Sequence, residues 1–201
     1  MINVLLNILI SYLIGSISGS LILGKIKGVD IRELGSGNAG GPNAFRTQGF
    51  LFAFGVVLID ALKGFIAAEY ISKLNLFGTD VQISTELGIL ICGLTAVVGH
   101  VYPVYHGFKG GKGAGTAMGM LIALHPLSLI LAVSLWVIVL VLTGFVGLGT
   151  MIGASSIPVF LYTSGEVSQF VFYPILSIIL ALFIIFTHRS NIQRMVAGNE
   201  N

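Results

Sequence analysis

The sequence has little charge, since only 9% of its 201 residues are Asp, Glu, Lys or Arg. A soluble domain carries about 25%, so these charges are too few to cover a water-soluble globule. The single cysteine, Cys92, excludes an internal disulfide and with it a disulfide-stabilised secreted mini-protein. A disordered chain is excluded because 55% of the residues are hydrophobic. The net charge of +2 gives no sign of a general polyanion-binding surface. What remains is a small polytopic membrane protein.

Apolar runs of the length that crosses a bilayer, about 20 residues each, follow one another along the chain. The clear runs are Ile2–Gly24, Gly49–Ile71, Glu86–Tyr105, Leu127–Thr143, Val146–Tyr162 and Phe170–Thr187. A seventh run, Ala114–Leu124, is too short to cross alone, at about 16 Å of helix. It is either a short helix packed inside the protein or an extension of the next run through His125 and Pro126.

The distribution of basic residues favours seven helices. With seven spans and an outside N-terminus, eight of the ten basic residues fall on three inner segments, 25–48, 106–113 and 188–201. Six spans would put the last of these segments on the outer side. The positive-inside rule therefore predicts an all-α fold with seven transmembrane helices, one of them short. We expect one integral-membrane domain over residues 1–201, with the N-terminus outside and the C-terminus cytoplasmic.

Small residues four positions apart predict close helix packing. The pairs are Gly15 with Gly19, Gly115 with Gly119 and Gly149 with Gly153. Packing within one chain is the favoured interpretation, and a dimer face is the alternative.

The first inner segment contains a glycine-rich loop, Gly35 to Gly41. Glycine lets backbone N–H groups approach an anion closely, and successive N–H groups form anion-binding nests. The loop also fits the pattern G-x-G-x-x-G, but it follows a membrane helix instead of a strand, so this match carries no weight. Polar side chains favour a phosphate site over a flexible turn. They are Ser36, Asn38, Asn43 and Arg46.

The second inner segment gives a sharper signal. It reads Lys109-Gly110-Gly111-Lys112-Gly113, and an apolar helix begins directly afterwards. Backbone donors, two ammonium groups and a helix N-terminus together are typical of a phosphate site. It is not a Walker A loop, because no glycine lies five residues before a Gly-Lys-Ser/Thr. A plain positive-inside loop would explain the lysines but not the alternating glycines.

The remaining candidates are less specific. His188, Asn191 and Arg194 follow the last span, where basic residues commonly extend to the interface. Asp60 and Lys63 lie three residues apart within a span, so a functional site and a buried structural pair explain them equally well. For His100 we expect a structural, hydrogen-bonded role. With one cysteine and no acidic cluster, we expect no metal site.

In order, the three segments resemble the three motifs of the bacterial acyl-phosphate-dependent glycerol-3-phosphate acyltransferases, often called PlsY. The matching stretches are Gly35 to Arg46, Gly99 to Gly113, and His188 to Glu200, and the pattern Asp60-x-x-Lys63 also fits. The resemblance covers essentially the whole chain. Two departures occur: Pro42 stands where members commonly have threonine, and Ala114-Gly115 replaces the more usual Val-Ala.

This resemblance implies a reaction and a set of site residues. A fatty acyl group would move from acyl phosphate to the 1-hydroxyl of glycerol 3-phosphate, giving lysophosphatidic acid and inorganic phosphate without a cofactor. Catalytic roles are implied for Ser36, Arg46, His188 and Asn191. Substrate-binding roles are implied for Gly37, Asn38, Gly40, Asn43, Lys109, Gly110, Gly111, Lys112 and Gly113. Roles that are structural or unassigned are left for Asp60, Lys63, His100 and Glu200, and Glu200 is expected to anchor the tail against a basic residue.

The expected setting is the cytoplasmic face of a bacterial inner membrane. The expected partners are glycerol 3-phosphate, acyl phosphate and membrane lipids, without nucleic acid, and a monomer is favoured over a dimer. A transporter of a phosphorylated metabolite is the alternative function. It is disfavoured because all three motifs fall on one face, whereas alternating access expects a site near the midplane. A phosphatidyl-alcohol transferase would need a metal-binding aspartate cluster, and the sequence has none.

Overall fold

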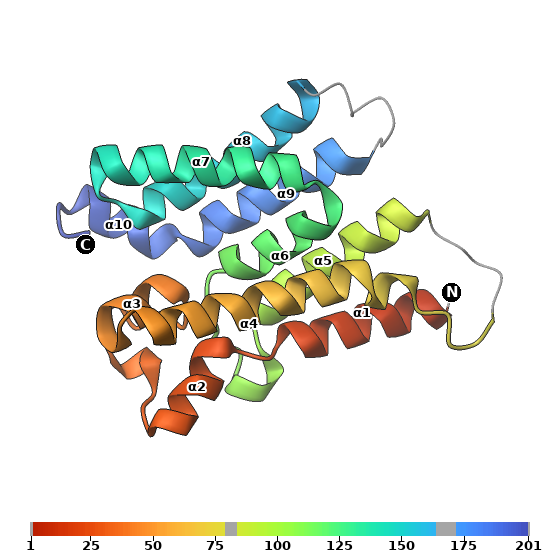
Figure 1. The fold of residues 1–201 in the computed structure, drawn as a ribbon, viewed down its shortest axis with the longest axis horizontal. Helices are drawn as coiled ribbons and strands as arrows, with labels where there is room; N and C mark the ends of the chain where they lie inside the picture. The colour runs from red at the N-terminus through yellow and green to blue at the C-terminus, as the bar shows by residue number, and fades with distance from the viewer. Residues whose placement is uncertain (1, 79–83, 164–171, 201) are drawn as a thin grey trace. The chain divides into compact units, whose positions relative to one another are not determined.

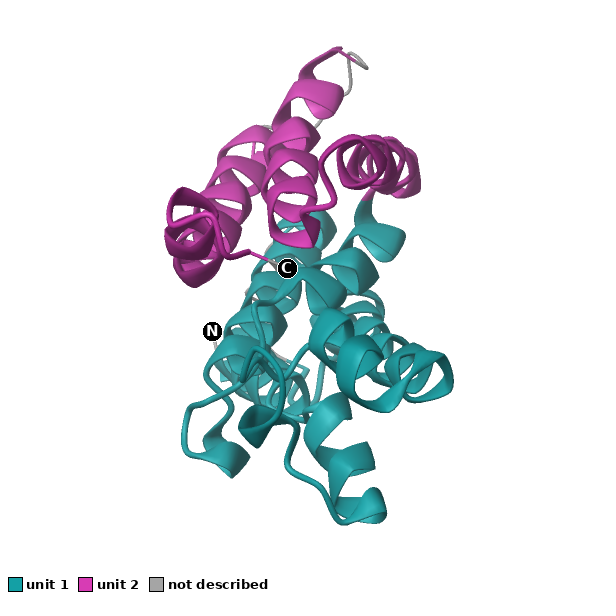
Figure 2. Cartoon of the chain, turned by 90° about the vertical axis from the view of Figure 1, so that its left-hand side faces the viewer, with its two compact units in different colours: residues 1–124 teal, residues 125–201 magenta. Residues whose placement is uncertain are grey.

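The structure is a computed structural model that describes residues 2–78, 84–163 and 172–200. These residues contain helices and no strand, so the predicted all-α class is confirmed. The chain divides into two compact units, Met1–Leu124 and His125–Asn201, which Figure 2 colours separately.

Unit 1 contains six α-helices and three short 3-10 helices among its described residues (Figure 1). In chain order they are α1 (Ile2–Gly15), α2 (Gly19–Lys27), η1 (Ile31–Glu33), α3 (Gly41–Gln48), α4 (Phe50–Glu69), η2 (Ile71–Lys73), α5 (Thr85–Val101), η3 (Val104–His106) and α6 (Ala114–Leu124). Unit 2 contains α7 (Pro126–Thr143), α8 (Val146–Thr163), α9 (Phe172–Thr187) and α10 (Arg189–Val196).

Five helical segments of the described chain are long and apolar enough to cross a bilayer. They are Ile2–Lys27, Phe50–Lys73, Thr85–His106, Pro126–Thr143 and Val146–Thr163. A sixth span results if α9 and α10, bent by 53° at their junction, are taken as one. The short helix α6 has the bounds that the sequence predicts, while the total of seven spans and their orientation stay predictions. The predicted start of the last run, Phe170, lies outside the described residues.

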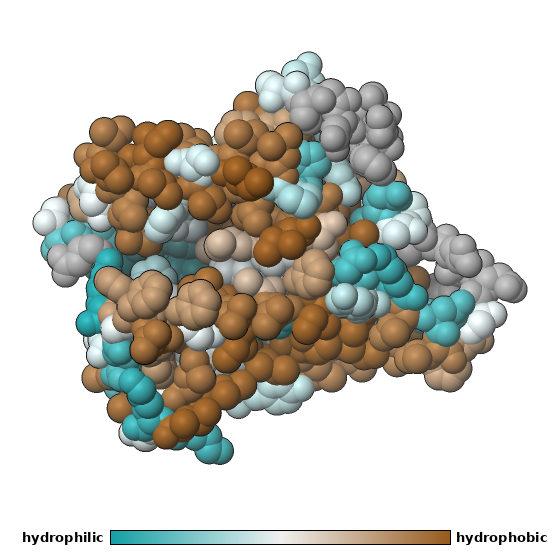
Figure 3. Space-filling model, in the orientation of Figure 1, coloured by the Kyte–Doolittle hydropathy of each residue, from teal (hydrophilic) through white to brown (hydrophobic). Residues whose placement is uncertain are grey.

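Apolar side chains cover the outer surface of the long helices. In Figure 3, brown residues extend along α4, and teal residues gather at the ends of unit 1. Helix α1 shows the corresponding inner face: Asn3, Asn7 and Ser11, spaced four apart, are buried, while Leu5 and Leu9 are exposed. Polar side chains that pack against protein and apolar ones that face outward are the pattern expected when lipid is the solvent.

Glycines bring the helices of unit 1 into close contact. A Cβ at Gly64 of α4 would lie 2.0 Å from the carbonyl oxygen of Thr116, and one at Gly119 of α6 would lie 1.8 Å from that of Ala61. Gly15 of α1 approaches Ala96 of α5 in the same way. The contacts of Gly15 and Gly119 confirm packing within one chain at these two predicted small-residue positions. The contacts of Gly64 and Gly119 also hold α6 against α4, and this fixes the position of the start of α6 relative to α4.

Unit 2 is built around similar contacts. A Cβ on Gly149 of α8 would lie 3.0 Å from the ring of Trp136 on α7, whose Nε1–H donates to Thr150 at 3.3 Å. Near the start of α8, a Cβ at Gly147 would lie 2.6 Å from the amide nitrogen of Asn191 on α10. The helix that carries Asn191 is therefore packed directly on α8.

Candidate active site

The first glycine loop is organised by Asn43. Its side chain is 1% exposed, and its Nδ2 lies 3.0 Å from the carbonyl oxygens of Ile31, Leu34 and Asn38. Its Oδ1 accepts a hydrogen bond from the backbone N–H of Ser36 at 2.9 Å. The amide group is thus fully used inside the protein, where it replaces regular secondary structure as the partner of the loop backbone.

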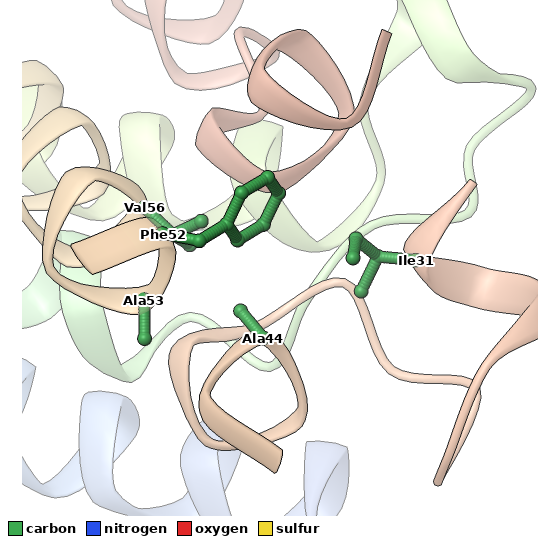
Figure 4. Packing of buried hydrophobic residues seen from close by; sticks show 5 residues of the cluster. All are labelled: Ile31, Ala44, Phe52, Ala53 and Val56. Carbon is green, nitrogen blue, oxygen red and sulfur yellow. The ribbon is translucent and has the colours of Figure 1, made fainter. Parts of the chain in front are cut away.

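Apolar packing anchors this loop to α4. Figure 4 shows Ile31 of η1 and Ala44 of α3 directed at Phe52, Ala53 and Val56 of α4, and all five side chains are at most 7% exposed. Burial of these side chains stabilises the start and the end of the loop, so the glycines between them do not need to supply packing.

Ser36 and Arg46, the predicted catalytic residues of this segment, are exposed, and Asn38 is half-buried. Gly37 has a φ of +72°, a left-handed conformation that glycine adopts without strain. Gly40 is the residue before α3, and a Cβ there would lie 2.6 Å from the side-chain nitrogen of Asn38. The segment therefore presents a hydroxyl and an amide just before the N-terminus of α3 and a guanidinium in its last turn. These are groups that suit an anion.

The second loop folds back onto the end of α5. The N–H of Gly110 donates to the carbonyl of Val101 at 3.1 Å, and the N–H of Gly111 donates to that of His100 at 3.2 Å. A Cβ at Gly110 would lie 1.9 Å from the carbonyl oxygen of His100. These two glycines, predicted to bind substrate, therefore use their N–H groups within the protein, and only glycine permits this close approach. Beside these two glycines, the loop contributes the positive charge of its two lysines and the first N–H groups of α6, which an α-helix leaves without a partner of its own.

Backbone strain precedes the lysines. Phe108 has a φ of +61° and follows Gly107 at +63°. Positive φ is rare for a bulky residue, and such strain concentrates at functional sites. After this turn Lys109 is exposed, Lys112 is half-buried and Gly113, with a φ of +91°, is buried directly before α6.

Arg32 connects the two loops, a role that the sequence analysis missed. Its guanidinium donates to the carbonyl of His106 at 3.3 Å and forms a 2.7 Å ion pair with Asp30. The hydrogen bond from Arg32 holds the pKa of the Asp30 carboxyl below its ordinary value. The only sequence signal for this contact is that Arg32 is one of the basic residues of the first inner segment.

Asp60, Lys63 and His100 form one buried cluster, and each is 3% exposed. The Lys63 ammonium lies 2.9 Å from Asp60 Oδ1 and 2.7 Å from His100 Nδ1, and it donates to the carbonyl of Ile17. Asp60 also accepts from the N–H of Gly19 at the start of α2. The structure thus combines the predicted intramembrane pair and the predicted structural histidine, which the sequence treats separately.

The third segment lies in unit 2. His188 follows α9, is 5% exposed, and has its Nδ1 2.7 Å from the carbonyl oxygen of Ile184. Because a carbonyl only accepts, Nδ1 carries a hydrogen, and in the neutral ring Nε2 keeps its lone pair. Glu200 accepts from Asn191 and, at 2.6 Å, from Arg194. Glu200 therefore contacts a basic residue, as expected for a residue that anchors the tail.

No group of three His, Cys, Asp or Glu side chains that could hold a metal ion occurs in the described parts of the chain.

Comparison with known proteins gives a consistent result. The family described as Glycerol-3-phosphate acyltransferase matches residues 5–198. The glycerol-3-phosphate acyltransferase of Chlorobaculum parvum is 39% identical over 93% of this chain and 90% of its own length, and that of Chlorobium limicola is 36% identical over 93% and 91%.

Two solved structures are also similar. Crystal structures of PlsY (YgiH), an integral membrane glycerol 3-phosphate acyltransferase, in its glycerol 3-phosphate and lysophosphatidic acid forms give TM-scores of 0.84 and 0.82. Each is 35% identical and aligns with 98% of this chain and 94% of its own. On the strength of a family match along almost its entire length, together with this likeness in sequence and structure, the chain belongs to the glycerol-3-phosphate acyltransferase (PlsY) family of integral membrane proteins.

Proposed function

We propose that this protein transfers a fatty acyl group from acyl phosphate to the 1-hydroxyl of glycerol 3-phosphate, forming lysophosphatidic acid and inorganic phosphate. The observation that carries the proposal is the joining of the two cationic glycine loops. Arg32 of the first segment hydrogen-bonds to the second, and a Cβ on Gly111 would lie 3.1 Å from the carbonyl oxygen of Ala39. Two adjacent anion-binding loops fit a reaction in which both substrates carry a phosphate.

The first loop is proposed to hold the acyl phosphate. Ser36, Asn38 and Arg46 supply donors for its phosphate, and Arg46 suits bidentate phosphate binding. Gly37 and Gly40 are proposed to keep the backbone open to the phosphate. For Asn43 we propose a supporting role in place of direct contact, because its amide is already occupied by the loop backbone.

The second loop is proposed to hold glycerol 3-phosphate. Lys109 and Lys112 supply positive charge, and Gly113 allows the chain to enter α6 with its N-terminal N–H groups available. Gly110 and Gly111 contribute by fitting against His100, not through their N–H groups.

The chemical step is an acyl transfer. The 1-hydroxyl oxygen of glycerol 3-phosphate attacks the acyl carbonyl carbon, the bond from that carbon to the phosphate oxygen breaks, and phosphate leaves. His188 is proposed to take the hydroxyl proton at Nε2, with a substrate phosphate as the other possible acceptor. Asn191 is proposed to orient the reacting groups, with its own amide positioned by Glu200.

The proposed setting is the cytoplasmic face of a bacterial inner membrane, with residues 1–201 acting as a single domain. This follows from the basic character of the three segments and the positive-inside rule. Membrane lipids would surround the apolar helix faces, and the acyl chain of the donor would enter from the lipid.

The test is an assay of the detergent-purified protein with glycerol 3-phosphate and either acyl phosphate or acyl-CoA, following release of phosphate or CoA and formation of lysophosphatidic acid. We expect turnover with acyl phosphate and little with acyl-CoA. Preference for acyl-CoA would refute the proposed donor. Inactivity with both donors, together with uptake of glycerol 3-phosphate by vesicles containing the protein, would favour a transporter instead.

A further inference from the structure

The buried cluster of Asp60, Lys63 and His100 fixes the protonation pattern of the histidine. An ammonium group has three hydrogens and accepts none. Lys63 directs them to the carbonyl of Ile17, to Asp60 Oδ1 and to His100 Nδ1. His100 Nδ1 is therefore an acceptor, and the neutral ring carries its hydrogen on Nε2.

The donor on Nε2 lies under the second glycine loop. A Cβ built on Gly111 would lie 2.2 Å from this nitrogen, so the absence of a side chain at Gly111 leaves room for it. His100 is 3% exposed, and its side-chain contacts with the described residues all run through Nδ1. Nε2 thus has no acceptor among them and is left to donate to a molecule bound at the loop.

The missing acceptor belongs in the loop that we propose for glycerol 3-phosphate. Lys109 and Lys112 flank Gly111, so their positive charge attracts the oxygen of an anion to the space beside Gly111. Because Lys63 already neutralises Asp60 and occupies Nδ1, a bound phosphate would meet a neutral N–H donor of fixed direction at His100. Such a preorganised donor binds without the cost of reorientation.

We propose that His100 is a substrate-binding residue whose Nε2–H donates to an oxygen of glycerol 3-phosphate, and that Lys63 and Asp60 are positioning residues that hold it in this tautomer. This inference rests on the proposed function of the second loop. It assigns the buried ion pair a purpose beyond packing, because the pair sets which nitrogen of His100 faces the loop.

Two substitutions separate this role from a structural one. In His100→Gln the side-chain amide reaches as far as Nε2 and can still donate toward Gly111. In His100→Asn the shorter amide can still accept from Lys63 at the place of Nδ1 but does not reach the loop. We expect His100→Asn to raise the KM for glycerol 3-phosphate about 10- to 100-fold, as for a lost hydrogen bond to a charged group. We expect His100→Gln to raise it less than about threefold, with the KM for acyl phosphate unchanged in both.

The opposite order, or equal effects of the two substitutions, would overturn the proposal. Folding of each variant is checked through the protection of buried Cys92 from a maleimide dye during heating. A second measurement is nitrogen NMR of histidine-labelled protein, in which the ring signal of His100 is identified by its absence in His100→Gln. This step is needed because His125, whose Nδ1 accepts from the N–H of Ser128, has the same tautomer. We expect a neutral His100 ring protonated at Nε2 whose signal shifts when glycerol 3-phosphate is added. A His100 ring protonated at Nδ1, or a His100 signal that does not respond to the substrate, contradicts the inference. Wild-type inactivity with acyl phosphate would instead refute the proposed donor and leave this binding measurement to decide the role of His100.

Discussion

Replacement of Asn43 by Asp tests whether this side chain supports the first loop or binds substrate. The two side chains have the same shape, and the carboxylate keeps an acceptor for the N–H of Ser36. It loses both hydrogens of Nδ2 and turns an acceptor oxygen toward the carbonyls of Ile31, Leu34 and Asn38. The substitution therefore removes the donors and puts a buried negative charge in their place.

The size of the effect follows from the burial of these carbonyls. The contact with Ile31 is buried, so its loss costs about 2 kcal/mol, near the middle of the range for an unsatisfied buried group. The contacts with Leu34 and Asn38 are only part-buried and water can replace them, which costs about 0.5 kcal/mol each. These losses sum to about 3 kcal/mol before the cost of the buried charge, so opening of the loop should become at least roughly 100-fold more frequent.

Hydrogen exchange of the purified protein measures this opening directly. The amides of Ser36 and Gly37, which are hydrogen-bonded inside the loop, should lose protection in Asn43→Asp. The loss should shrink at low pH, because protonation of the introduced carboxyl returns one donor. Asn38→Asp is the matched control, since it makes the same chemical change in the same loop at a side chain that provides none of these bonds. If Asn43→Asp keeps wild-type protection and loses only turnover, Asn43 contacts substrate and the reasoning is wrong.

Three further predictions concern other parts of unit 1. Lys112→Ala should raise the KM for glycerol 3-phosphate at least tenfold and change kcat less, because a phosphate-binding charge is lost; an unchanged KM in steady-state kinetics would count against the assignment. Gly119→Ala should lower the melting temperature strongly, because its Cβ would lie 1.8 Å from a backbone oxygen of α4, whereas Gly115→Ala, with a nearest contact of 3.3 Å, should be much milder. A dye-based melting curve that gives equal shifts would contradict this packing. Asp30→Asn should lower stability slightly at neutral pH, because Arg32 keeps the pKa of Asp30 below its ordinary value. The pair contributes above that ordinary pKa and is lost as the pH falls through the lowered one, so melting curves of wild type and variant should converge in acid and stay apart at neutral pH.

Local patterns in the sequence were sufficient to predict where the helices and the three candidate segments lie. Apolar runs predict helix positions because each span must satisfy its own backbone hydrogen bonds in lipid. The bounds of α6 were predictable since Gly113 precedes it and His125-Pro126 follows it. Glycines alternating with lysines likewise predict a phosphate-binding loop at Lys109 to Gly113. None of these inferences needs a contact between residues that are far apart in the sequence.

The roles of individual polar groups could not be predicted in this way. The sequence suggests that Asn43 and the N–H groups of Gly110 and Gly111 face substrate, yet the structure gives them partners within the protein. The sequence shows which hydrogen-bond donors are present, but not which of them are hydrogen-bonded within the folded protein.

The sequence by itself determined that this chain is an all-helical membrane protein with glycine-rich cationic loops of the PlsY kind, because hydrophobicity, glycine content and charge act over a few neighbouring residues. Only the tertiary structure decided that Lys63 meets His100, 37 residues further along the chain, and that the free nitrogen of this histidine faces Gly111. Such contacts depend on how the helices of unit 1 pack, and glycine allows the close approach of α4 to α6 and of α1 to α5. The shortage of charge first indicated a membrane protein, and the low dielectric of its interior is the reason that a buried ion such as Lys63 needs a specific partner.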